Sequence, residues 1–469
     1  MKKAKKILLP LILALLLVAV AVFATACGGN DSPDKNYSPA SDFAWEIVDG
    51  NVNITGYTGN DKEVIIPKLI EWRTVTSIGG GAFYGCLNLT SITIPDGVTS
   101  IGDYTFYECT NLASITIPDS VTSIGDSAFS YCERLTSITI PDSVISIGGR
   151  AFANCTSLTS IVVHGSVTDI GYSAFSNCTG LVSVTIGNSV KNIGEWAFYG
   201  CMNLTSITIP ESVTSIGDSV FSYCTSLASI IVDENNPNYK SIDGNLYSKD
   251  GKILVAYAAG KQETTFIIPE GVTSIGDYAF CYCEGLTSII IPDRVTSINE
   301  RAFFGCTGLT NITIPGSVTS IGDYAFSYCT SLASIIVDEN NPNYKSIDGN
   351  LYSKDEKILV AYAAGKQESS FIIPEGVSSI GDSAFCCCTG LTSIIIPDSV
   401  ISIGDFAFYD CRCLVSIKLP NSITSIGDHA FSGCTNLTIY CEATTQPEGW
   451  EDGWNSSECP VVWGYEAKE

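Results

Sequence analysis

The sequence predicts an α/β repeat protein, a solenoid in which short strands and short helical turns follow one another along a single stack. Two observations support this. A phrase of the form Ala-Phe-x-x-Cys-x-x-Leu-x-x-Ile-x-Ile recurs, and its cysteine returns every 23 residues from Cys86 to Cys224. A fixed period of this length is typical of a solenoid, because one turn cannot bury its apolar face alone and must stack on its neighbours. We therefore expect function on the faces of the stack, with no closed pocket.

Each repeat divides into three predicted elements, as the copy at residues 82–103 illustrates. The stretch Leu89-x-x-Ile92-x-Ile94 alternates apolar and polar positions, as a short half-buried strand does. Residues 98–101, Val-Thr-Ser-Ile, predict a second extended segment. Residues 82–86, Ala-Phe-Tyr-Gly-Cys, predict a short helical turn, and Asp103 can cap the amides of the turn that follows.

The stack is expected to contain about 16 turns and two β-hairpin insertions. Counting the residue after each Ile-x-Ile core gives 16 turns, most of them 23 residues apart, with two longer steps of 36. In the long steps, residues 245–255 and their later copy show alternating side-chain character on both sides of a turn, which favours a hairpin. Segment 221–263 recurs as segment 326–368 with one change. The hairpins therefore belong to a duplicated block, and we expect both to project from the stack.

The N-terminal residues predict export. Lysines at 2–6 precede an apolar run at 7–23 and the sequence Ala24-Thr25-Ala26-Cys27. This pattern resembles a bacterial lipoprotein signal, which implies that Cys27 carries a lipid and becomes the new N-terminus. An uncleaved membrane helix is the alternative, because the run is nearly long enough to span a bilayer. The expected divisions are a signal peptide at 1–26, a flexible tether at 27–41, an N-terminal cap at 42–66, the solenoid at 67–441 and a C-terminal cap at 442–469.

Composition excludes one class of partner. The formal net charge is −25 at pH 7, and a surface of this sign repels the phosphate backbone of nucleic acids. The sequence contains 20 cysteines, which in an exported protein suggests disulfides. Thirteen of them share one repeat position, where cysteine serves as a small buried apolar residue; a bridged ladder is the alternative. Cys441 and Cys459 flank the non-repetitive end and can pair to staple the cap.

Three phrases recur across about Asp42 to Tyr465, namely Leu-x-x-Ile-x-Ile-Pro, Val-x-x-Ile-Gly and Ala-Phe-x-x-Cys. They resemble the BspA-like class of leucine-rich repeats. The resemblance implies a leucine-rich-repeat solenoid on a bacterial surface, opened by residues 52–57 and closed by a segment that ends near Trp463. It also implies adhesion to host or neighbouring-cell components, without a shared ligand.

No motif indicates an enzyme, a cofactor or a metal site. His164 and His429 occupy ordinary repeat positions in distant turns, so neither is placed to activate a cysteine nucleophile. Cysteine clusters such as residues 386–388 lie within the repeat register and lack the paired spacing of zinc sites. A recurrent aspartate column is explained by capping of the turns, with calcium binding as the alternative. This column comprises Asp103, Asp126, Asp218, Asp277, Asp323, Asp382, Asp405 and Asp428.

The outward side of the Leu-x-x-Ile-x-Ile strand is the candidate functional surface. Its central outward residue is usually threonine in the first half of the chain, as at Thr93 and Thr116, and usually isoleucine later. A contiguous exposed apolar row tends to mark an interaction site, although β-propensity and duplication explain the same row without a ligand. The candidate ligand-binding residues, with one tyrosine from each hairpin, are Ile231, Ile267, Ile290, Ile336, Ile372, Ile395, Tyr247 and Tyr352.

These features predict a lipid-anchored protein of the cell envelope, outside the cytoplasmic membrane. Its expected task is adhesion, by binding a protein or glycan on a host or neighbouring-cell surface through the solenoid face and the hairpins. Two alternatives remain. The chain can serve as a passive spacer in the envelope, or its Ser-x-Thr rows can bind ice as in some β-solenoids.

Overall fold

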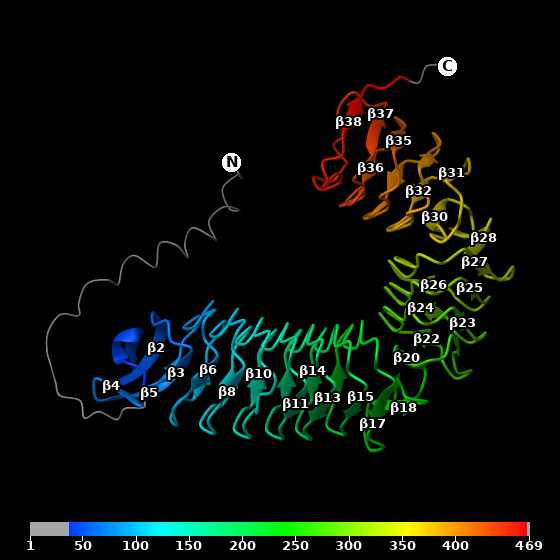
Figure 1. The fold of residues 1–469 in the computed structure, drawn as a ribbon. Helices are drawn as coiled ribbons and strands as arrows, with labels where there is room; N and C mark the ends of the chain where they lie inside the picture. Colours follow the sequence, from blue (N-terminus) through cyan, green and yellow to red (C-terminus); the bar gives the residue numbers. More distant parts are fainter. Residues whose placement is uncertain (1–36, 467–469) are drawn as a thin grey trace. The chain divides into compact units, whose positions relative to one another are not determined.

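The computed structural model describes residues 37–466; the predicted signal peptide and Cys27 lie outside them. Within these residues the one helix is η1 (Ala40–Asp42). Every other element is a short strand or a turn, and the turns stack on one another along the chain (Figure 1). The unit from Ser38 onward contains both strand ladders.

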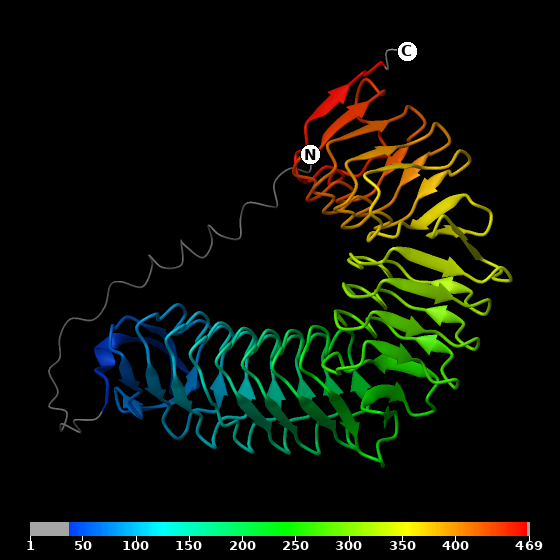
Figure 2. The same ribbon diagram turned by 45° about the vertical axis from the view of Figure 1, so that its right-hand side comes forward.

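The first ladder consists of the strands predicted from Leu-x-x-Ile-x-Ile, paired in parallel and in register from turn to turn (Figure 2). It falls into four sheets, and between the first two Ser137 of the intervening turn forms a single bridge to Ser160. Its strands are β3 (Glu63–Ile65), β6 (Ser91–Thr93) and β8 (Ser114–Thr116); β11 (Ser160–Val163), β13 (Ser183–Ile186), β15 (Ser206–Ile209) and β17 (Ser229–Val232); β21 (Thr265–Ile267), β23 (Ser288–Ile290), β25 (Asn311–Ile314) and β27 (Ser334–Val337); and β31 (Ser370–Ile372), β33 (Ser393–Ile395), β35 (Ser416–Leu419), β37 (Thr438–Cys441) and β38 (Val461–Trp463).

The second ladder consists of the strands predicted from Val-x-x-Ile. Its buried isoleucines pair with one another, as Ile101 does with Ile124. Its strands are β2 (Asn51–Tyr57), β5 (Arg73–Ile78), β7 (Ser100–Ile101), β9 (Ser123–Ile124), β10 (Ser146–Ile147), β12 (Asp169–Ile170), β14 (Asn192–Ile193) and β16 (Ser215–Ile216); β20 (Ile253–Ala256), β22 (Ser274–Ile275), β24 (Ser297–Ile298) and β26 (Ser320–Ile321); and β30 (Ile358–Ala361), β32 (Ser379–Ile380), β34 (Ser402–Ile403) and β36 (Ser425–Ile426). At its start, β1 (Phe43–Val48) pairs antiparallel with β2, and β4 (Leu69–Ile70) pairs antiparallel with β5.

The stack has about 18 turns, so the expected count of 16 is wrong. Counting the residue after each Ile-x-Ile core missed one turn at each end of the stack. Strand β2 pairs in parallel with β5 and thus begins the second ladder before the first Ile-x-Ile core. Strand β38 pairs in parallel with β37 and continues the first ladder beyond the last core.

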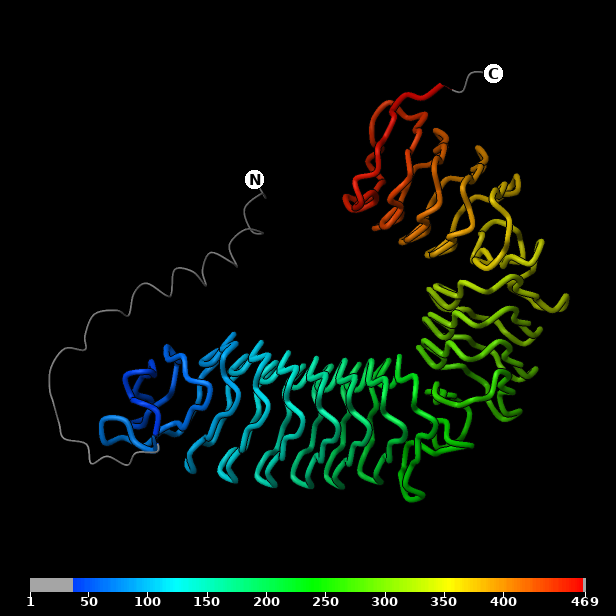
Figure 3. The backbone as a smooth tube through the Cα atoms, in the orientation of Figure 1, coloured from blue at the N-terminus to red at the C-terminus, as the bar shows by residue number. Residues whose placement is uncertain are grey.

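The predicted helical turns are not helices. In each of these segments, which we call tips, two residues four apart adopt the left-handed conformation, as Tyr104 and Glu108 do with φ of 58° each. Their amides, and that of Phe106 between them, bond to the next repeat; Phe106 N–H donates to the carbonyl of Ala128 at 2.7 Å. Hydrogen bonds between turns therefore replace the bonds along the chain that a helix needs. The tube through the Cα atoms shows this repeated path (Figure 3).

The two long steps do not carry projecting two-stranded hairpins. In the first, β18 (Tyr239–Ile242), β19 (Asn245–Ser248) and β20 form an antiparallel unit. The second contains β28 (Tyr344–Ile347), β29 (Asn350–Ser353) and β30 in the same order. Strands β20 and β30 pair in parallel with β22 and β32, so each inserted unit belongs to the stack. Buried Asn236 and Asn341 hold the entry to each unit by bonding to backbone carbonyls of the preceding turn.

The core is a column of stacked phenylalanines. Phe152 lies 5.2 Å from Phe129 and 5.4 Å from Phe175, with ring planes within 3° of parallel. The apolar core forms three clusters, which meet at the inserted units. There a tyrosine replaces the phenylalanine, as at Tyr257 and Tyr362.

The repeated cysteine holds successive turns together as a thiol. Its S–H donates to the carbonyl of the phenylalanine 26 residues earlier, as Cys178 Sγ does to Phe152 at 3.1 Å. Burial raises the pKa of Cys178 to about 12, so the group stays protonated and can donate. The position thus requires a residue that is small, apolar and still able to donate a hydrogen bond.

The aspartate column also connects turns, and the expectation that each residue caps its own turn is wrong. A carboxylate oxygen of Asp103 accepts the N–H of Asp126, 23 residues later, at 2.8 Å. Asp405 accepts the N–H of Asp428 in the same way at 2.8 Å. The amide of the left-handed residue that follows Asp103, Tyr104, also points to the next repeat and donates to the carbonyl of Asp126 at 2.8 Å.

Candidate functional site

The predicted isoleucine row lies on the exposed side of the first ladder. The six side chains, at positions 231, 267, 290, 336, 372 and 395, are between 48% and 65% exposed. Ile267 pairs in register with Ile290, and Ile372 pairs with Ile395. The row is interrupted where the sheets end, between β17 and β21 and between β27 and β31. Its residues therefore form short apolar strips, each on one sheet.

The two tyrosines predicted to bind ligand from the insertions do not lie on the surface. Tyr247 is 0% exposed and Tyr352 is 1% exposed. Their strands, β19 and β29, are the middle strands of the inserted units, and their rings belong to the apolar core. Burial raises the pKa of both phenol groups. This prediction is wrong, because pairing of β20 and β30 with the second ladder covers the side chains that a projecting hairpin would expose.

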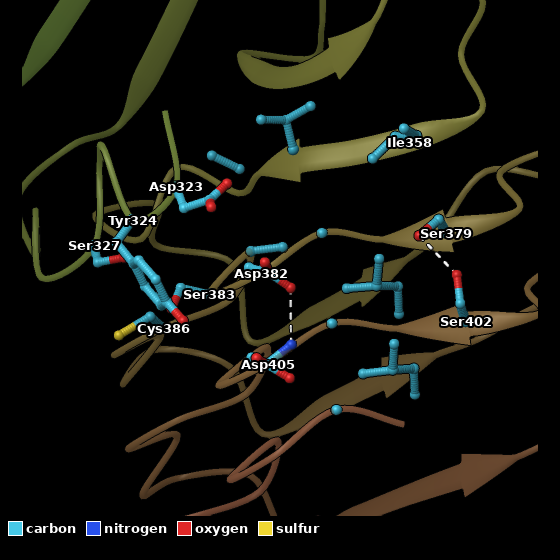
Figure 4. Close-up of a pocket in the computed structure, with 18 of the residues that line it drawn as sticks. Asp323, Tyr324, Ser327, Ile358, Ser379, Asp382, Ser383, Cys386, Ser402 and Asp405 are labelled. Atoms are coloured by element: carbon cyan, nitrogen blue, oxygen red, sulfur yellow. Dashed lines mark hydrogen bonds between the residues drawn. The ribbon is translucent and has the colours of Figure 1, made fainter. Parts of the chain in front are cut away.

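The expectation of no closed pocket did not anticipate two open hollows beside the inserted units. A cavity of about 530 Å³ lies beside the second inserted unit, and Asp323, Asp382 and Asp405 line it (Figure 4). A cavity of about 190 Å³ occupies the equivalent place beside the first unit, where Asp218 and Asp277 line it. Both form because the inserted strands interrupt the stacking of the tips. The 36-residue steps in the sequence are the signal that could have located them.

The hollow beside the second unit is lined by carboxylates, and one of them is bonded to a backbone amide of the protein itself. A carboxylate oxygen of Asp382 accepts the N–H of Asp405 at 2.8 Å. Burial, together with the charges of Asp405 and Asp323, raises the pKa of Asp382. No group of three or more His, Cys, Asp or Glu side chains in residues 37–466 is arranged to hold a metal ion.

The predicted disulfide of the C-terminal end is not present. Cys441 ends β37, whereas Cys459 occupies the next position of the thiol column, with Sγ 3.3 Å from the carbonyl oxygen of Cys434. All cysteines in the described part of the chain are free thiols. The place of each thiol is set by its position in the repeat. The repeat pattern is harder to recognise in the sequence after residue 441.

The two histidines make ordinary surface contacts. His164 Nδ1 lies 3.1 Å from a carboxylate oxygen of Asp142. His429 Nδ1 lies 2.9 Å from the hydroxyl of Ser456. Each contact involves a neighbouring turn and no cysteine, so these contacts form no nucleophile and base pair.

Stacked short strands, an isoleucine-rich core and an exposed strand face define a leucine-rich-repeat solenoid. The model of the BspA type leucine-rich repeat region matches residues 61–178, 146–254, 255–360 and 360–444. The chain belongs to this family.

Solved structures of bacterial proteins resemble this one. A leucine-rich cell surface protein from Faecalibacterium prausnitzii A2-165 is 30% identical, with 92% of this chain and 98% of that chain covered and a TM-score of 0.53. A leucine-rich repeat protein from Bacteroides ovatus ATCC 8483 is 28% identical, with 90% and 98% covered and a TM-score of 0.48. The pneumococcal vaccine antigen PcpA is 20% identical, with 90% and 96% covered and a TM-score of 0.47. No curated protein matches the chain.

Residues 37–466 contain no helix of the length and hydropathy that a membrane span requires.

Proposed function

We propose that this protein is a binding protein of the bacterial cell surface that recognises a protein or glycan partner on a host or neighbouring cell. The observation that carries the proposal is the exposed isoleucine row of the first ladder. Apolar side chains presented in register on adjacent strands make a surface that gains free energy when a partner covers it. This chemistry favours a protein over a glycan at the strand face.

The location follows from two kinds of support. The relative from Faecalibacterium prausnitzii is described as a cell surface protein. The N-terminal residues of this chain have the pattern of a lipoprotein signal, and Cys27 is the residue that would carry the lipid. The chain would then be held on the outer side of the membrane by a tether, with the strand face free to meet a partner.

The test replaces isoleucines of the row by threonine, the residue that most turns of the first half carry at the same position. The variants are Ile290→Thr and Ile336→Thr, alone and together. Val162→Thr is the matched control, because Val162 is also outward and 42% exposed but lies before the isoleucine row. The mature chain is applied to immobilised extracellular-matrix proteins and bacterial surface polymers, and retention is measured.

The double variant is expected to lose retention while the control keeps it. Unchanged retention of a double variant with an unaltered circular dichroism spectrum would refute the role of the row. Binding of surface polymers alone would assign the face to a glycan instead of a protein.

A passive spacer is the second candidate, and the duplication provides its test. In-frame deletion of residues 264–368, one copy of the repeated block, shortens the stack and removes the isoleucines at 267, 290 and 336. A spacer would tolerate this loss, whereas a binding protein would lose retention. For ice binding, the threonine rows are short, since Thr93 pairs with Thr116 but residue 139 lies outside any strand. A thermal-hysteresis measurement tests that function.

A further inference from the structure

The tips carry aromatic residues that the fold does not require. Their two left-handed positions suit glycine, asparagine and serine better than bulky side chains. Two tips obey this preference at both positions, one with Gly81 and Gly85 and the other with Ser173 and Asn177. In the turns near the inserted units the same positions hold large rings, including Tyr278, Tyr282 and Tyr328, at φ of 55° to 62°. Other turns accept one ring at these positions, as at Tyr104 and Trp196, but among the described tips those at 278–282 and 324–328 alone carry tyrosine at both, which points to a role for these side chains.

These rings form a row that crosses the inserted units. Tyr223 and Tyr282 lie on opposite sides of the first unit, yet their ring centroids are 4.7 Å apart. The row continues with steps of 5.6 Å to Phe304 and 4.8 Å to Tyr328. Tyr328 lies 6.2 Å from Tyr409, across the second unit. The inserted turns contribute no tip of their own, so the flanking tips meet directly.

Ring orientation separates this row from the buried phenylalanine column. Core rings lie nearly parallel and cover one another's faces, as Phe152 and Phe175 do at 3°. In the tip row the planes cross at 64°, 78° and 44° between successive rings. Neighbouring rings therefore meet edge to face instead of lying flat on one another, and the tyrosines are half-buried. The part of each ring that its neighbours leave uncovered can stack on a flat apolar surface.

The rings surround a hollow of about 340 Å³, which we call the tip cleft. Tyr278, Tyr282, Arg301, Tyr324, Tyr328 and Tyr409 are among the residues that line it. The guanidinium of Arg301 lies 4.6 Å from the ring centre of Tyr324 and 5.4 Å from that of Tyr278. One Arg301 nitrogen also bonds to Glu300 at 2.8 Å, which offsets its charge. The cleft thus offers aromatic faces, phenol hydroxyls and a neutralised guanidinium.

The duplicated block shows that these residues are not needed for folding. The positions 105 residues after Tyr278, Arg301 and Tyr324 hold Ser383, Phe406 and His429, and these turns have the same left-handed backbone. Ser219, the counterpart of Tyr324 in the earlier copy, likewise adopts φ of 55°. The fold accepts small or different side chains at each position, so the set around Arg301 is specific to this cleft.

We propose that the tip cleft binds an uncharged oligosaccharide chain, at a site separate from the strand face. Pyranose rings present flat C–H faces that stack on aromatic rings, and hydroxyls at their edges that pair with phenol, serine and guanidinium groups. The ring steps of about 5 to 6 Å suit successive sugar units along the row. An anionic ligand is disfavoured, because Glu300 offsets the one cation and the whole chain is strongly acidic.

The test uses substitutions that the fold already contains. Tyr282→Asn installs the residue of positions 154 and 177, and Phe304→Ser installs that of positions 130 and 176. Tyr84→Ser is the matched control, because Tyr84 holds the same tip position as Phe304 but does not line the cleft. Ile290→Thr reports on the strand face. The full chain is run in native gels that contain soluble mixed-linkage β-glucan, xylan or galactomannan, and circular dichroism checks each fold.

We expect at least one polysaccharide to retard the wild-type chain, and the Tyr282→Asn, Phe304→Ser double variant to weaken binding by about tenfold or more. The Tyr84→Ser and Ile290→Thr variants should keep wild-type retardation. Failure of all three polysaccharides to retard the wild-type chain would overturn the proposal. Binding of a fluorescent octaproline peptide that depends on Tyr282, without polysaccharide binding, would also overturn it and assign the cleft to an extended peptide.

Discussion

The phenylalanine column makes a quantitative prediction at Phe152. This ring is fully buried and stacks on both neighbours at 5.2 and 5.4 Å. Phe152→Ala removes both contacts and leaves a cavity, for which Phe→Ala changes typically cost about 3 to 5 kcal/mol. The neighbouring turns cannot close in, because backbone bonds of 2.7 and 2.8 Å hold residues 151 and 152 to adjacent repeats. We therefore expect a loss of about 4 to 5 kcal/mol, in the upper half of that range.

The assay combines urea unfolding, followed by far-ultraviolet circular dichroism, with amide hydrogen exchange. Because each repeat contacts only its neighbours, protection should fall most in residues 129–198 and little beyond the first inserted unit. Phe152→Leu is the matched control. It keeps most of the volume and should cost less than about 1.5 kcal/mol. An alanine variant no less stable than the leucine variant, or a uniform loss of protection along the chain, would refute the reasoning.

Three further predictions follow from individual contacts. Asn341→Ala should cost at least about 2 kcal/mol in urea unfolding, since two buried carbonyls and two N–H groups lose their partner; the exposed Asn340→Ala is the control, and equal effects would contradict this. Cys178→Ala should cost about 1 to 2 kcal/mol through the lost carbonyl donor and burial, whereas exposed Cys413→Ala should be neutral. For Asp382, the raised pKa means that the native state holds its proton more tightly than the unfolded state, so wild-type stability falls as pH rises through that pKa. Asp382→Asn keeps the acceptor and should be more stable than wild type at neutral pH, with the difference vanishing in acid; a constant difference from acid to neutral pH would argue against it.

Periodicity predicted the stack because the same inward positions, such as Ile92 and Ile101, recur along the chain and are buried in most copies. It wrongly predicted helical turns at the tips, because a repeated Ala-Phe-x-x-Cys spacing suits both a helical turn and a segment bonded to the next repeat. Only the left-handed backbone at positions such as Tyr104 distinguishes the two, and a tyrosine there gives no such signal.

The candidate surfaces likewise divide into features that local sequence predicts and features that depend on contacts between distant segments. Exposure of Ile290 and its row followed from strand alternation, which is a local property. Burial of Tyr247 depended on whether β20 joined the second ladder, which is a pairing between residues 21 apart, such as Ile253 and Ser274. The tip cleft depended on contacts such as that of Tyr223 with Tyr282, across an inserted unit. Alternation within a strand contains no information about such neighbours.

The bonds between turns have a constant offset, with thiol bonds spanning 26 residues and aspartate bonds spanning 23. A gene segment that encodes whole repeats can therefore be copied or lost, because each remaining thiol and aspartate still has a bonding partner at the right distance. The length of such a protein can change in evolution without redesign of its interior. The repeated block at 221–263 and 326–368 is one such event preserved in this chain, and the divergence of its tips around Arg301 shows how a spare copy gains a surface of its own.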